Sequence, residues 1–333
     1  MRYTTNSNIQ AFFFTRPDYK TIPLLPLFLL IIVSIAAWHN DVFAFNATLG
    51  INGGYDNNVN ATPDESGSTF TTFHMNLNHQ MSHDKAYGKS GIYLNSFYKY
   101  FSQFEDNLAA NAGAYYSFFP GSDRFMTLGL IETGMYRDEE DKYDELNRIK
   151  TGVQLKYFHS GRTTFHLAQY FNWNRYLEPV EYAVLEQQSG SGSGNAGTSL
   201  LVLTKHRNDC YASTDLGINI KLHPMFTLTM YALYNKLYSN IETEAYDGFG
   251  SSVYCRFSPD PSWGISTEGF IWRNTYDGGF NRTDTYRSVN LLANLFIDRY
   301  ELFLRADFMD NDSSFDDETY TRIITQCGIS VFF

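Results

Sequence analysis

Beyond residue 44 the chain has no apolar run as long as a membrane-spanning helix requires, and apolar and polar residues alternate instead. The pattern is clearest at the C-terminus, where one row holds Ile323, Thr325, Cys327, Ile329, Val331 and Phe333, and the other holds Arg322, Gln326, Gly328 and Ser330. Because successive side chains of a strand point to opposite faces, these rows indicate a strand with one apolar face and one wet face. A membrane protein made of such strands satisfies its backbone only if the sheet closes on itself.

The same alternation recurs in fourteen segments, and short and long connections between them take turns along the chain. The predicted strands span residues 45–55, 69–82, 86–101, 108–119, 124–137, 147–159, 162–176, 209–222, 225–239, 247–257, 263–276, 285–297, 300–309 and 319–333. Short turns on one side and longer loops on the other are typical of transmembrane barrels. We therefore predict an all-β fold: a single closed, antiparallel, up-and-down transmembrane barrel of about fourteen strands, with twelve and sixteen as the alternatives.

The first 44 residues have the composition of an export signal. An apolar run over residues 22–37 follows basic residues and precedes the small-residue sequence Val42-Phe43-Ala44. Prolines interrupt the run, and it is shorter than the roughly 20 residues of a spanning helix. We predict that residues 1–44 are a signal peptide cleaved after Ala44, and that residues 45–333 form the barrel.

The end of the chain carries a pattern of polar residue, glycine, hydrophobe and terminal aromatic, formed by Gln326, Gly328, Val331 and Phe333. This pattern resembles the barrel-closing signal of Gram-negative outer-membrane β-barrel proteins, a porin-like class, and no motif indicates a narrower family. The resemblance implies a place in the cell outer membrane, contact with outer-membrane lipid and lipopolysaccharide, and recognition by the barrel-assembly machinery. The 25 Tyr and 28 Phe are enough to supply the aromatic girdles of such a barrel.

Polar and charged residues on the rows opposite the apolar ones are expected to face the lumen, because an ionised side chain facing mid-membrane lipid costs about 2–4 kcal/mol. The lumen-lining candidates are His74, Asn76, Lys99, Lys150, Lys156, His166, Asp215, Lys221, Arg256, Glu268, Glu301, Arg305, Asp307 and Arg322. Bases and acids within one wall favour a channel, or porin-like passage, for small polar solutes. The alternative is that these charges pair across strands and only hold the wall together.

The longest connection, residues 177–208, has two β-prone runs on either side of a Gly/Ser-rich tip. We expect an extracellular hairpin that rises above the membrane, with a loop folded into the lumen as the other arrangement. A tall hairpin also supports a second function, a non-conducting barrel for adhesion or for surface-polymer assembly or export.

Enzymatic, metal-binding and nucleic-acid functions have weaker support. A lipid-modifying hydrolase would use His206 and Asp209, but no matching nucleophile or motif accompanies them. The acidic stretch from Asp310 lacks the glycine of a calcium loop, since Phe315 stands at that position, so we expect no metal site. No cofactor motif is found, and the net charge of −11 leaves no basic surface for nucleic acid.

Overall fold

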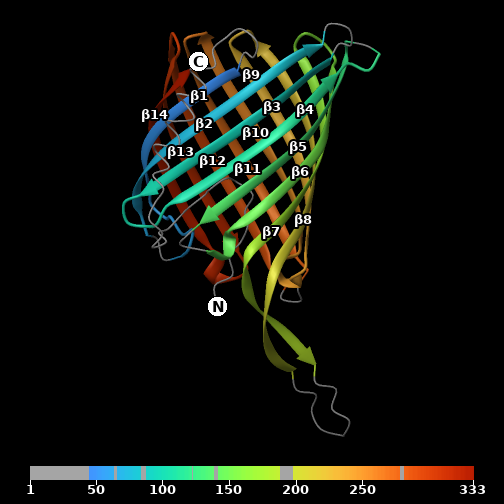
Figure 1. Cartoon of the computed structure of the whole chain (residues 1–333), viewed down its shortest axis with the longest axis vertical. Coiled ribbons are helices and arrows are strands. Elements are labelled where there is room, and N and C mark those ends of the chain that lie inside the picture. The colour runs from blue at the N-terminus through green and yellow to red at the C-terminus, as the bar shows by residue number, and fades with distance from the viewer. Residues whose placement is uncertain are drawn as a thin grey trace.

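The computed structural model describes residues 45–63, 66–83, 88–121, 123–138, 142–187, 198–277 and 281–333. Fourteen antiparallel strands pair in chain order and close into one barrel (Figure 1). The strands are β1 (Phe45–Asp56), β2 (Ser68–His83), β3 (Gly88–Phe101), β4 (Asn107–Phe118), β5 (Phe125–Asp138), β6 (Leu146–Phe158), β7 (Thr163–Gln187), β8 (Thr198–His223), β9 (Phe226–Ser239), β10 (Tyr246–Asp260), β11 (Trp263–Tyr276), β12 (Thr283–Ile297), β13 (Tyr300–Ser313) and β14 (Tyr320–Phe332). The predicted fold and strand number are confirmed.

The last strand closes the barrel against the first. The β1–β14 ladder runs from Thr48 opposite Phe332 to Asp56 opposite Ile324. Next to the Thr48–Phe332 pair, the Phe333 backbone N–H donates to the Ala47 carbonyl at 2.9 Å. Three residues of the predicted closing pattern lie within this ladder, where Gln326, Gly328 and Val331 are opposite Gly54, Asn52 and Leu49. The sheet therefore has no free edge between its first and last strands.

The two ends of the barrel differ in their connections. At what we call the turn end, two-residue turns such as Pro224-Met225 and Asp298-Arg299 join strands, and β1 begins where β14 finishes. At the opposite loop end, three connections carry 3₁₀ turns: η1 (Lys142–Asp144), η2 (Glu242–Glu244) and η3 (Asp316–Glu318). Such an asymmetry between short turns and longer loops is typical of transmembrane barrels.

Strands β7 and β8 continue as a paired ribbon beyond the loop end (Figure 1). Their ladder is regular from Thr163 to Arg175, shifts register before Pro179, and resumes as far as Gln187 opposite Thr198. The tip of the predicted hairpin lies outside the described residues, as does the predicted signal peptide. Within the described part of the chain, no helix is long and apolar enough to cross a membrane.

The outward rows form an apolar belt around the barrel. Its most exposed members include Ile131, Ile149, Val153, Leu216, Ile271, Val289, Leu291 and Leu304. Aromatic side chains flank the belt at both ends: Phe125, Tyr157, Phe165, Phe257 and Trp263 at the turn end, and Tyr55, Tyr100, Trp173, Tyr238 and Phe249 at the loop end. Such a belt between aromatic girdles is the surface that a bilayer covers.

In the barrel wall, two strand ends lie three or more residues beyond their predicted positions. β10 continues to Asp260 and β13 continues to Ser313, several residues beyond the predicted ends. Asp310 and Asp312 are therefore strand residues and not part of a loop. On the outward row Arg287 pairs with both, with its Nη1 2.7 Å from Asp310 and its Nη2 3.7 Å from Asp312, which lets an acidic segment stay in the sheet.

Candidate functional site

The inner wall of the barrel carries all fourteen predicted lumen residues. The register places each of them on the rows opposite the apolar belt. Lys156 lies opposite His166, for example, and Arg305 lies opposite Gln326. A closed sheet has only two faces, so the register alone decides on which of them a strand residue lies.

At the loop end, Arg322 and Asp56 form a buried ion pair across the β1–β14 seam. The guanidinium Nε donates to both carboxylate oxygens at 3.0 and 3.2 Å, and Nη2 donates to Oδ2 at 2.5 Å. Lys99 on β3 approaches the same carboxylate at 3.8 Å and lies over the rings of Phe70 and Phe101. This cluster joins four neighbouring strands where the barrel closes.

A second arginine cluster joins β8 to the turn η2. Arg207 pairs with Asp209 at 2.7 Å and with Glu244 at 2.7 Å, and its guanidinium carbon lies 4.7 Å from the centre of the Tyr176 ring. Arg207, Asp209 and Tyr176 are all buried. The cluster therefore fixes the β9–β10 connection against the wall.

A third cluster repeats this arrangement on β12 and the turn η3. Arg282 donates to Asp284 through Nε and Nη2, and to Glu318 through Nη1 at 3.3 Å, while Tyr276 lies under the guanidinium at 4.5 Å. Burial opposes the charge of Arg282, but its hydrogen bonds to Asp284 and the charges around it hold the pKa of the guanidinium above its ordinary value. The cluster therefore favours the charged form of Arg282.

Sequence reasoning missed the arginines of the second and third clusters, although a signal was present. Arginine is followed two residues later by aspartate at Arg207, Arg282 and Arg305. Residues i and i+2 of a strand share a face, so each such motif favours an ion pair along that face. The structure forms all three, with Arg305 donating to Asp307 at 2.8 and 3.0 Å.

The middle of the inner wall holds one further network. Glu132 accepts a hydrogen bond from the Tyr93 hydroxyl at 2.7 Å and one from Arg148 at 3.0 Å. Lys150 lies over the Tyr170 ring at 4.9 Å. This part of the wall therefore contains charges that are compensated locally.

Three predicted cations have no such compensation. Within the described part of the chain, Lys156, Lys221 and Arg256 take part in no ion pair, and the side chains of Lys221 and Arg256 are exposed. They lie on β6, β8 and β10 toward the turn end. Among the described residues, Glu268 accepts a hydrogen bond from the amide of Asn290 and Glu301 accepts one from the amide of Asn294, both at 3.3 Å.

Burial differs between the two ends of the inner wall. At the loop end an apolar group contains Val59, Phe70, Phe101 and Ile324, and a second contains Leu237, Tyr246 and Tyr276. Toward the turn end, inward-facing Asn46, Asn76 and Asn78 are exposed. The wall is thus packed at the loop end and carries exposed polar side chains toward the turn end.

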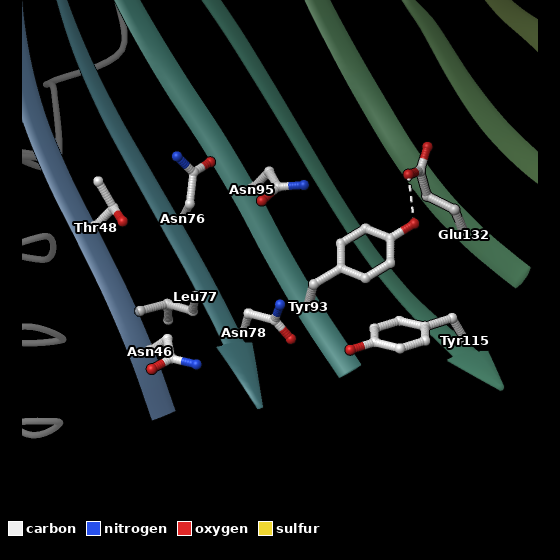
Figure 2. Close-up of a pocket in the computed structure, with 9 residues that line it drawn as sticks. All are labelled: Asn46, Thr48, Asn76, Leu77, Asn78, Tyr93, Asn95, Tyr115 and Glu132. Atoms are coloured by element: carbon white, nitrogen blue, oxygen red, sulfur yellow. Dashed lines mark hydrogen bonds between the residues drawn. The ribbon is translucent and has the colours of Figure 1, made fainter. Parts of the chain in front are cut away.

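A recess of about 610 Å³ lies among these exposed polar side chains, on the wall formed by β1 to β5. Figure 2 shows its lining: Asn46, Thr48, Asn76, Leu77, Asn78, Tyr93, Asn95, Tyr115 and Glu132. Of these residues, Asn76 is one of the lumen-lining candidates given by the sequence.

The tyrosine rings of the recess lie flat against the wall. A Cβ on Gly113 would fall 2.4 Å from Cζ of Tyr93, and one on Gly91 would fall 2.4 Å from Cζ of Tyr115. Each glycine is the cross-strand partner of the ring that covers it. The missing side chain thus provides the space in which the ring lies.

The residues considered for catalysis and for calcium are not assembled into such sites. His206 is exposed, whereas Asp209 is buried and pairs with Arg207. Among the described residues, no group of His, Cys, Asp and Glu has the arrangement of a metal site.

No protein family and no curated relative matches the chain by sequence. By structure the chain is similar to OmpT of Vibrio cholerae, with a TM-score of 0.49 and 8% identity over 87% of this chain and 97% of that one. It is also similar to an anion-selective porin from Comamonas acidovorans, with a TM-score of 0.47 and 9% identity over 88% and 99%. Pseudomonas aeruginosa OccK2 gives 0.40 and 8% over 87% and 98%.

Three features of this chain itself place it in a membrane: the closed meander, the apolar belt and the aromatic girdles. A closed antiparallel barrel with short turns at one end and longer loops at the other is the architecture of bacterial outer-membrane proteins. The chain therefore has the fold of an outer-membrane β-barrel protein.

Proposed function

We propose that the barrel is a passive channel for small polar solutes. Lys221 and Arg256 carry the argument: they face inward, they have no ionic partner among the described residues, and their side chains are exposed. An ammonium or guanidinium group in a dry interior is strongly unfavourable unless it is paired. Water therefore fills the lumen around them.

The dimensions of the barrel agree with a narrow passage. Fourteen strands about 4.8 Å apart and tilted by about 40° close at a backbone radius of roughly 14 Å. Eight-stranded barrels are filled by their side chains and those with sixteen strands enclose a channel, so a fourteen-stranded one leaves a limited bore. The buried apolar groups at the loop end make that end the narrower one.

The uncompensated charges favour a transverse field inside the bore. Lys156, Lys221 and Arg256 lie on the wall from β6 to β10, and Glu268 and Glu301 lie on the wall from β11 to β13. A polar solute with its own dipole would be oriented between these walls.

The proposal is tested by the conductance of the purified full chain in a planar bilayer. We expect steps of constant size, and a conductance at least as large in a variant that lacks residues 178–207. If neither protein conducts, the lumen is closed and the proposal is refuted. The variant excludes the case in which only the hairpin blocks the bore.

The β7–β8 ribbon favours a second function, attachment of a partner at the cell surface. The paired backbone beyond the barrel presents a tall platform that the lumen does not need. On this alternative, deleting the hairpin abolishes adhesion or polymer binding and leaves permeability unchanged.

The membrane context also suggests partners. The loop end, which we place outside the cell, would meet lipopolysaccharide, and the barrel-assembly machinery would engage β14. Exchange of Phe333 for a polar residue should then slow assembly in cells more than folding into pure lipid.

A further inference from the structure

The recess on the inner wall of β1 to β5 has the chemistry of a carbohydrate site, and we propose that it binds a neutral oligosaccharide. The inference rests on the proposed function only for the route by which the sugar reaches the lumen. Its volume of about 610 Å³ lies within the range of small-molecule sites, roughly 300–1,000 Å³.

Four asparagines supply the polar contacts. Asn46 lies opposite Asn78, and Asn76 lies opposite Asn95, so the amides stand as two cross-strand pairs. No hydrogen bond within the described part of the chain engages these four side chains, and all but Asn95 are exposed. Each amide offers two N–H donors and a carbonyl acceptor, and a sugar hydroxyl both donates and accepts. The pairs can therefore hold neighbouring hydroxyl groups of one ring.

Two tyrosines supply the apolar contact. Tyr93 and Tyr115 lie flat over Gly113 and Gly91, so their ring faces point toward the lumen, as the close-up of the recess indicates (Figure 2). The hydrogen bond from the Tyr93 hydroxyl to Glu132 fixes one of the rings. Flat, rigid aromatic faces beside hydrogen-bonding groups suit a sugar, which has a C–H face and a rim of hydroxyls.

The charge of the recess argues against an ionic ligand. Glu132 is the one ionisable carboxylate in the lining, and Arg148 already neutralises it at 3.0 Å. Neither an anion nor a cation would find an uncompensated opposite charge there. The carboxylate oxygens keep lone pairs that can accept from a hydroxyl group, so a neutral polyol remains the best match.

The test is calorimetric titration of the detergent-solubilised full chain with maltotriose, cellotriose and raffinose. We expect at least one trisaccharide to bind, and we expect Tyr93→Ala and Asn78→Ala each to weaken it by about tenfold, the effect of one good contact. Tyr231→Ala is the matched control, because that ring also lies over a glycine, Gly217, but on a different part of the wall, and it should leave affinity within about twofold.

The outcomes distinguish failure of the proposed sugar site from failure of the proposed channel. The site is refuted if none of the three sugars binds the wild-type protein at millimolar concentration, or if Tyr93→Ala and Asn78→Ala both bind like the wild type. An equal loss in Tyr231→Ala also refutes it, since the effect is then not specific to the recess. A protein that binds sugar but does not conduct refutes the channel and leaves the recess assigned.

Discussion

The ion pair at the barrel seam leads to a quantitative prediction. Replacing Arg322 with methionine keeps an unbranched side chain that reaches as far as the arginine Nε but removes the guanidinium group and its three hydrogen bonds to Asp56. The Asp56 side chain is fully buried, so the carboxylate cannot turn to water. Lys99, at 3.8 Å, is then the remaining cation beside it in the structure.

Removing one partner of a buried ion pair typically costs about 3–5 kcal/mol, because the other charge is left uncompensated. Lys99 and the backbone N–H of Asn58, at 3.2 Å, retain part of the compensation. We therefore expect Arg322→Met to lower the free energy of unfolding by about 2–4 kcal/mol. The double variant with Asp56→Asn removes the stranded charge and should recover at least about 1 kcal/mol of this loss.

The measurement is equilibrium unfolding by urea of the full chain folded into lipid vesicles, followed by tryptophan fluorescence. The reasoning fails if Arg322→Met loses less than about 1 kcal/mol, or if the double variant is less stable than the single one. The first result would mean that the seam is held by its backbone ladder alone, and the second that Asp56 is not desolvated.

Three further predictions concern the lumen and the loop end. Gly113→Ala should displace the Tyr93 ring from the wall and lower single-channel conductance, with little change in the melting temperature. The control is Gly129→Ala, where a new Cβ meets no atom within 4 Å. Equal effects of the two substitutions would contradict the flat-ring geometry. Lys221→Glu should shift the reversal potential in a salt gradient toward cation preference, and an unchanged potential would mean that this end of the bore does not select ions. Deletion of residues 178–207 should leave the barrel folded but less stable, because the β7–β8 ladder from Thr163 to Arg175 is untouched while Arg207 is lost from its cluster with Asp209 and Glu244; loss of heat-resistant mobility on gels would show otherwise.

Alternation of residue types was enough to predict the closed antiparallel barrel and its strand number. A period of two leaves little freedom once one face must meet lipid. The clusters at the loop end were harder, because they depend on contacts between connections. Arg282 reaches Glu318 in the turn η3, 36 residues on, and Arg322 reaches Asp56 across 266 residues. Contacts between residues so far apart in the sequence cannot be inferred from a short sequence pattern.

The recess could not be predicted for a related reason. Tyr93 and Tyr115 read as ordinary strand aromatics until the β3–β4 register places a glycine opposite each. That register depends on the lengths of the turns as well as on the residues themselves. The strand ends also escaped prediction, because Arg287 keeps the acidic residues at the end of β13 in the sheet.

The pairing of rings with glycines extends beyond the recess. His74 covers Gly50, Tyr170 covers Gly152, Tyr231 covers Gly217 and Trp272 covers Gly250 in the same manner. A ring laid down in this way takes up its thickness of about 3.5 Å and not its full length, so a wall can be lined with aromatics while its cross-section stays wide. Selection for a given lumen diameter would then act on the glycines. Related barrels would keep these ring–glycine pairs after most of their other residues had diverged.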